Sequence, residues 1–150
     1  MITDPTIIRI GDAVQLNHEG DRAAARVLFA ELWDEIGGER GDPLHRCTLA
    51  HAMADAQDDV HQELLWDQRA LDAADQLTDE RVAQAGVPLS VTGLYPSLHL
   101  NLSECYRRLG DLASARDHLR RAKERIDILA DDEYGRMIRN GMAEIAERLR

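Results

Sequence analysis

The chain has 150 residues, a net charge of −10 at pH 7 and an aromatic content of only 4%. This length suits one domain with its own hydrophobic core, and the many Ala and Leu residues favour helices packed on helices over a β-sandwich. The negative charge argues against nucleic acid or an anionic membrane as the main partner, because phosphate groups need a basic surface.

The first residues and the cysteines indicate a cytoplasmic protein. Residues 1–11 contain Asp4 and Pro5, not a basic stretch followed by an apolar one, so a secretory signal is not expected. No apolar run approaches the ~20 residues of a membrane-spanning helix. Cys47 and Cys105 are therefore expected to be free thiols, mostly buried. The preference for Arg, with Lys123 as the single lysine, points to a bacterial source.

The first helical hairpin is predicted over about residues 5–37. It begins at Asp4-Pro5, because Pro is tolerated in the first helical turn. Gly20-Asp21 then separates two stripes of apolar residues at helical spacing. The first stripe contains Ile7, Ile10 and Val14, and the second contains Ala25, Leu28, Phe29, Leu32 and Ile36.

The second hairpin is predicted over about residues 43–77, with the same Asp-Pro start at Asp42-Pro43 and a turn at Asp58-Asp59. An irregular insertion follows over about residues 78–95, whose first part, 78–85, can form a short helix. Its apolar residues are too many for a free loop: Val87, Leu89, Val91, Leu94 and Tyr95. They form either a bridge between hairpins, which we favour, or a lid over a groove.

The third hairpin, over about residues 96–129, has the clearest pattern, with a turn at Gly110-Asp111. A last amphipathic helix is predicted over about residues 132–149, with a polar outer side typical of a helix that covers the end of a stack. The third hairpin resembles a tetratricopeptide repeat at its turn and at Leu102, Ser103, Tyr106, Ala115, Leu119 and Ala122.

This resemblance implies an all-α fold: a right-handed α-α superhelix of three helical hairpins and a C-terminal capping helix, forming a single domain over residues 1–150. Tetratricopeptide arrays bind extended peptides along the face made by the first helix of each hairpin. The residues that the resemblance assigns to this groove are Thr48, Asp55, Leu100, Asn101, Glu104 and Arg108. Some members of the family bind the terminal carboxylate of a peptide with a clamp of Lys, Arg and Asn residues. We do not predict this function for the chain, because Ile10 and Val14 occupy the positions of the clamp's basic residues.

Four polar residues occupy positions where the repeat pattern has other residue types: His51, Glu63, Asp67 and His99. Buried carboxylates need hydrogen-bond donors, so structural pairs of His51 with Glu63 and of His99 with Asp67 are the favoured interpretation. The same residues are also suitable ligands for a transition metal or a small molecule. A shift of one residue in the weak second repeat would instead turn Glu63 and Asp67 toward solvent.

Enzyme motifs are lacking, although Cys47 and His51 share a helical face that could activate a thiolate. A buried cysteine beside a structural histidine is the favoured interpretation, and no cofactor or metal is assigned. The hypothesis is a non-catalytic module that binds a protein or peptide. The alternative is a small-ligand or metal-binding protein, with or without enzyme activity, that uses the four polar residues. A homodimer through exposed repeat faces is compatible with either.

Overall fold

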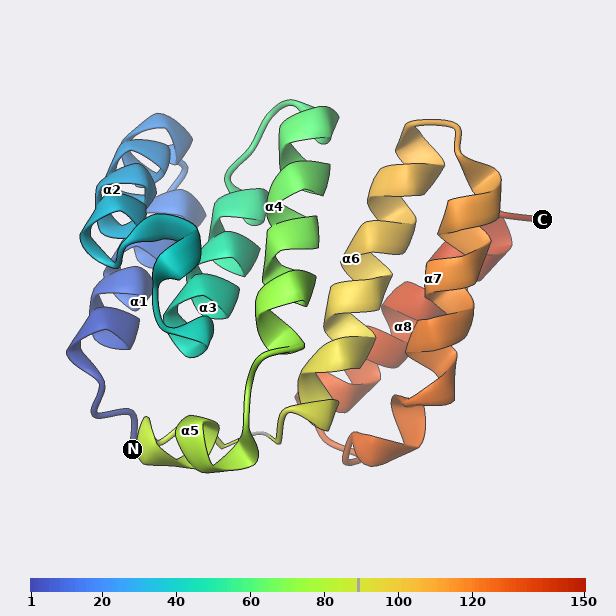
Figure 1. Ribbon diagram of the computed structural model, residues 1–150. Helices are drawn as coiled ribbons and strands as arrows, with labels where there is room; N and C mark the ends of the chain where they lie inside the picture. Colours follow the sequence, from blue (N-terminus) through green and yellow to red (C-terminus); the bar gives the residue numbers. More distant parts are fainter. Residues whose placement is uncertain (89) are drawn as a thin grey trace. The chain divides into compact units, whose positions relative to one another are not determined.

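The computed structural model describes residues 1–88 and 90–150. These residues form eight α-helices, three short 3₁₀ helices and no β-strand, which confirms the all-α class (Figure 1). None of the helices in the described residues is long and apolar enough to cross a membrane. The chain divides into two compact units, residues 1–91 and 92–150.

The first unit consists of two helical hairpins and one short helix. Its helices are α1 (Pro5–His18), α2 (Arg22–Glu35), α3 (Pro43–Asp55), α4 (Val60–Ala74) and α5 (Asp79–Gln84), with the 3₁₀ helix η1 (Gly38–Arg40) before α3. α1 pairs with α2, α3 pairs with α4, and α3 also contacts both helices of the first hairpin. The two hairpins therefore lie side by side, as in Figure 1.

Aspartate side chains begin six of the eight described α-helices: Asp4, Asp21, Asp42, Asp59, Asp111 and Asp132. The carboxylate of Asp4, for example, accepts hydrogen bonds from the backbone amides of Thr6 and Ile7 at 2.9 and 3.1 Å. Such a cap satisfies amides that have no partner within the helix and stabilises it by ~1 kcal/mol. The helix starts predicted at Asp4-Pro5 and Asp42-Pro43 are confirmed.

The predicted hairpin turns are also confirmed. Gly20 and Gly110 have φ angles of 92° and 84°, a left-handed conformation that costs glycine little. The second hairpin turns between Asp55, the last residue of α3, and Val60, the first residue of α4, without a glycine.

The core of the first unit lies between the two hairpins. Ile10, Phe29, Leu32 and Leu49 are each at most 1% exposed. The insertion contributes to the same core, because Val82 of α5 is buried there and Val87 and Val91 pack against it. The chain start lies beside α5 in Figure 1, where the amide of Thr3 donates to the carbonyl oxygen of Ala85 at 3.2 Å.

The second unit contains α6 (Tyr95–Arg108), α7 (Leu112–Glu124) and α8 (Glu133–Arg148), with the 3₁₀ helices η2 (Thr92–Leu94) and η3 (Ile126–Ile128). α6 and α7 approach closely where small residues meet, since the hydroxyl of Ser103 donates to the carbonyl oxygen of Ala115 at 2.7 Å. α8 packs against α6 and α7 with buried Ile138, Met142 and Ile145. The predicted terminal helix, 132–149, is therefore present.

The boundary between the units falls inside the predicted insertion, after Val91. The insertion is not a free loop, because Val82 is buried in the core of the first unit and Val87 and Val91 pack against this core. Leu89, also named in the prediction, lies outside the described residues. A single domain over 1–150, a right-handed superhelix, and the role of the insertion as a bridge or a lid stay predictions.

Candidate functional site

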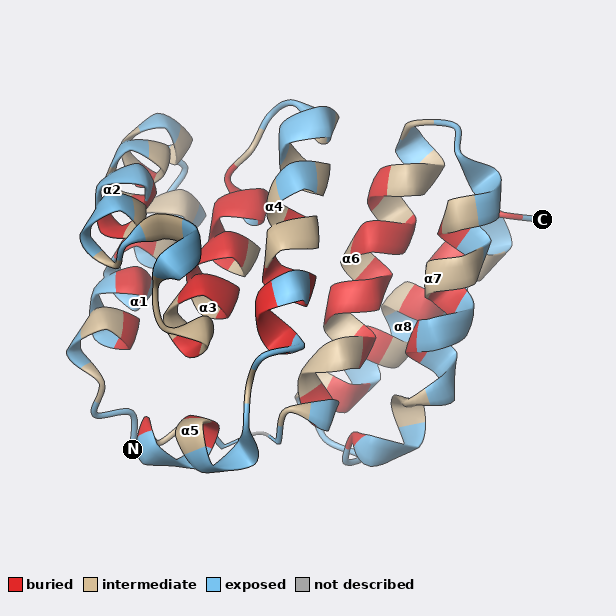
Figure 2. Cartoon of the chain, in the orientation of Figure 1, coloured by how far each residue is buried: buried red, intermediate tan, exposed pale blue. Residues whose placement is uncertain are grey.

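α3 exposes a single polar face. After its first residue, every residue of this helix is buried except His45, Thr48, His51 and Asp55, which recur at intervals of three or four and so share one face. Figure 2 shows α3 buried along most of its length. We call these four residues the α3 stripe. Two of the predicted groove residues, Thr48 and Asp55, belong to it.

The N-terminal end of the α3 stripe is held by an ionic network. Nε2 of His45 lies 2.9 Å from Oδ2 of Asp4, which also accepts a hydrogen bond from Nη2 of Arg81 at 3.0 Å. Nε of Arg81 donates to Asp42 at 2.9 Å. Burial alone would raise the pKa of Asp4, but the hydrogen bonds from His45 and Arg81 outweigh it and lower this pKa to about 2. Asp4 is therefore ionised under all ordinary conditions.

The C-terminal end of the stripe gathers further ionisable groups. The pKa of Asp55 is raised, first by desolvation and also by the negative charge of Glu63, while His51 and His18 oppose the shift. The side-chain amide of Asn17 donates to the backbone oxygen of Asp55 at 3.4 Å. His51 and Glu63 are thus both near Asp55. The direct pairing of His51 with Glu63 stays a prediction.

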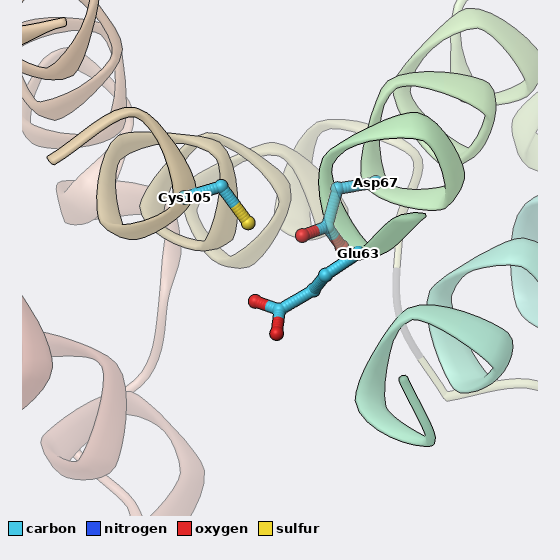
Figure 3. Close-up of side chains that lie close together, drawn as sticks. All are labelled: Glu63, Asp67 and Cys105. Carbon is cyan, nitrogen blue, oxygen red and sulfur yellow. The ribbon is translucent and has the colours of Figure 1, made fainter. Parts of the chain in front are cut away.

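Glu63 and Asp67 lie on one face of α4, one helical turn apart, as Figure 3 shows. Asp67 is 2% exposed and Glu63 is partly buried, so the alternative alignment that turned both residues toward solvent is wrong. Cys105, labelled in the same figure, belongs to α6 of the second unit. Asp67 belongs to the first unit and His99 to the second, so their predicted pairing is not tested by the structure of either unit.

His99 is buried in the second unit and has a partner that the sequence did not reveal. Its Nδ1 lies 3.0 Å from Nδ1 of His118 on α7, so one imidazole donates and the other accepts. The two rings stack, with His99 also against Tyr95 and His118 against Tyr106. Desolvation lowers the pKa of His118, with a smaller contribution from Arg121. In the sequence, His118 lies between apolar positions of α7. This pattern does not indicate that His118 has a partner on α6.

The predicted groove face of α6 is partly wrong. Leu100 belongs to the core of the second unit together with residues of α8, and a side chain added at Gly141 would come within 2.9 Å of it. Glu104 pairs with Arg107 at 2.8 Å, with Arg108 at 3.6 Å and with Arg148 of α8 at 3.7 Å. Because α8 packs on this face, Leu100 is a core residue. Asn101 and Arg108 stay predictions.

The possible thiolate of Cys47 is excluded by its surroundings. Cys47 is 5% exposed, and desolvation raises the pKa of its thiol to about 12. A thiol with this pKa stays protonated at neutral pH and is a poor nucleophile. The interpretation of Cys47 as a buried structural residue is therefore favoured by the structure.

Comparison of the chain with models of protein families, with curated proteins and with solved structures gives no match. The resemblance to tetratricopeptide repeats consequently rests on the residue pattern alone. The α3 stripe offers a hydroxyl, imidazoles and a carboxylate, which can donate to and accept from the polar groups of a bound segment.

Proposed function

We propose that this chain is a non-catalytic recognition module of the tetratricopeptide type, in which the α3 stripe contacts an extended segment of a partner protein. The observation that carries the proposal is a row of four polar residues, three partly exposed and Asp55 exposed, on one face of a helix that is otherwise buried after its first residue. A polar face on such a rigid helix loses little conformational freedom when it binds a ligand. Thr48, in the middle of the stripe, is the expected centre of contact.

The charge of the first unit supports a basic partner segment. This unit contains 7 Arg and no Lys against 18 Asp and Glu residues, a net charge of −11. A field of this sign attracts cationic segments and accelerates their association. Asp55, at one end of the stripe, is the stripe's own acceptor for a Lys or Arg side chain.

The proposal is tested with an array of extended peptides that differ in charge, followed by fluorescence anisotropy on those that bind. Basic peptides should bind, and Thr48→Arg should weaken binding at least tenfold while the helical circular dichroism signal is kept. Ala23→Arg, an equal charge change at an exposed position of α2, should change affinity much less. Equal binding by Thr48→Arg and Ala23→Arg would show that the partner uses another surface.

The second candidate function is the binding of a metal ion or small ligand by His51, Glu63, Asp67 and His99. It is favoured by one observation, the closeness of His51 and Glu63 to Asp55. Elemental analysis of protein purified without chelators separates the two candidates. A stoichiometric transition metal that is lost in a His51→Ala variant would support the second candidate over the first.

A further inference from the structure

Arg46 of α3 is a buried cation whose hydrogen bonds go to neutral groups. It is 8% exposed; its Nε donates to the carbonyl oxygen of Gly41 at 2.9 Å and its Nη2 to the side-chain oxygen of Gln76 at 2.8 Å. Within the described part of the chain, neither of the hydrogen bonds given for this guanidinium goes to a carboxylate. A buried charge is costly unless it is paired, so the remaining donors of Arg46 favour an anionic group.

Arg46 lines a pocket of about 270 Å³ in the first unit. None of the four residues of the α3 stripe lines this pocket. The other lining residues come from α2, η1, α4 and the turn that follows α4: Trp33, Glu39, Arg69, Asp72 and Gln76. Pockets that enclose drug-sized molecules have volumes of roughly 300–1,000 Å³. The ligand of this pocket must therefore be small.

Aromatic and cationic groups form one wall of this pocket. Trp33 meets Trp66 edge to face, with ring centroids 5.0 Å apart. The guanidinium carbon of Arg69 lies 4.4 Å from the Trp66 ring centroid, and Nε of Arg69 lies 3.5 Å from a carboxylate oxygen of Glu39. Stacking and pairing restrain Arg69, so the wall is preorganised.

Two cations and two carboxylates line the pocket, and they differ in burial. Arg46 is buried and Arg69 is partly buried, whereas the carboxylates of Glu39 and Asp72 belong to exposed residues. A simple anion would have to pass these carboxylates and the net charge of −11 of the first unit. A molecule that carries both an ammonium and a carboxylate group meets no such barrier.

We propose that this pocket binds a small amino acid as a zwitterion. Its carboxylate accepts hydrogen bonds from Arg46, and its ammonium group lies near Glu39 and Asp72. This site is separate from the proposed peptide-binding surface, and neither proposal depends on the other.

The two tryptophans of the chain supply the readout, because Trp33 lines the pocket and Trp66 packs against Trp33. The full-length protein is titrated with each standard amino acid, with acetate and with ethylamine at constant ionic strength. Fluorescence and calorimetry are recorded in parallel. At least one amino acid should give a saturable signal, and acetate and ethylamine should give none at the same concentrations. Equal binding of acetate, or no signal from any amino acid, would overturn the proposal.

Variants test the two charges separately. Arg46→Gln should weaken amino acid binding at least tenfold, while Arg40→Gln, which removes an exposed guanidinium of η1, should leave it unchanged. If Arg46→Gln does not fold, the double variant Glu39→Gln/Asp72→Asn decides, because both of these residues are exposed. In the double variant the preference for the amino acid over acetate should disappear. Retention of that preference would contradict the proposal that the pocket binds a zwitterion.

Discussion

At the scale of single residues, Asp4 shows how a local feature becomes a tertiary one. Its carboxylate caps α1 and also bonds to His45 and Arg81. Arg81 in turn reaches Asp42, the cap of α3, at 2.9 Å. One arginine of α5 therefore joins the N-terminal ends of two helices, where negative charge is already favoured by the helix dipole. The caps were predictable from the Asp-Pro pairs, but Arg81 was not.

Asp4→Ala should lower the free energy of unfolding by about 1–2 kcal/mol at pH 7 through loss of the cap and of the ionic bonds, after allowance for solvent screening. A carboxylate with a depressed pKa stabilises the folded state above its ordinary value of 3.8, and this stabilisation is lost as the pH falls toward about 2. Urea denaturation at several pH values should show the difference from the parent shrinking below about pH 4. Asp12→Ala, at an exposed position of α1, is the control and should show no such convergence.

Cys47 should resist alkylation in the folded protein. Its burial and its thiol pKa of about 12 leave almost no thiolate at pH 8. Mass spectrometry after treatment with iodoacetamide should find Cys47 unmodified until urea is added. Rapid modification in native buffer would restore the reactive Cys47–His51 hypothesis.

At the scale of helices, α6 shows why the predicted groove was only partly right. Leu98 and Leu102 are four residues apart, so they share one stripe of α6, and both are buried. Leu100 belongs to a different face, and α8 makes that face a second buried surface. The periodicity of α6 identifies the stripe that packs on α7, but it contains no information on which face a later helix covers.

Leu100→Arg should therefore destabilise the protein by about 3 kcal/mol or more, because it puts an unpaired charge into the core. Thr48→Arg, on the non-buried face of α3, should melt within a few degrees of the parent. Thermal denaturation followed by circular dichroism measures both. A Leu100→Arg variant as stable as the parent would return Leu100 to the groove.

The two glycines Gly86 and Gly11 should respond to alanine in opposite directions. Gly86 has a φ of 78°, and an added Cβ would lie 1.9 Å from the backbone oxygen of Met1, so Gly86→Ala should cost about 1–2 kcal/mol. Gly11 lies within α1 with nothing within 4 Å of an added Cβ, so Gly11→Ala should stabilise by up to ~1 kcal/mol. Chemical denaturation of both variants gives the signs directly.

At the scale of the whole molecule, composition and packing divide at the same boundary. The first unit has a net charge of −11, while the second has 11 Lys and Arg against 10 Asp and Glu residues, a net charge of +1. Each unit also has its own hydrophobic core. The net charge of −10 for the chain therefore originates in the first unit, while the second unit is nearly neutral.

Separate cores predict separable unfolding. Both tryptophans belong to the first unit, so their fluorescence reports its unfolding, whereas circular dichroism reports the helices of both units. Met142→Ala, a cavity in the second core costing about 2–5 kcal/mol, should move the circular dichroism transition to lower urea and leave the fluorescence transition in place. Coincident transitions in this variant would instead support the single cooperative domain predicted from the repeats.

The sequence by itself determined the all-α class, the helix starts at Asp4-Pro5 and Asp42-Pro43, and the turns at Gly20 and Gly110. Their spacing of four residues also places Glu63 and Asp67 on one face of a helix. These features depend on contacts within a few residues, which periodicity and capping rules describe. Only the tertiary structure decided the burial of Leu100, the partner of His99 and the pocket at Arg46. These depend on residues that are distant along the chain and are brought together by helix packing, and no local pattern encodes them.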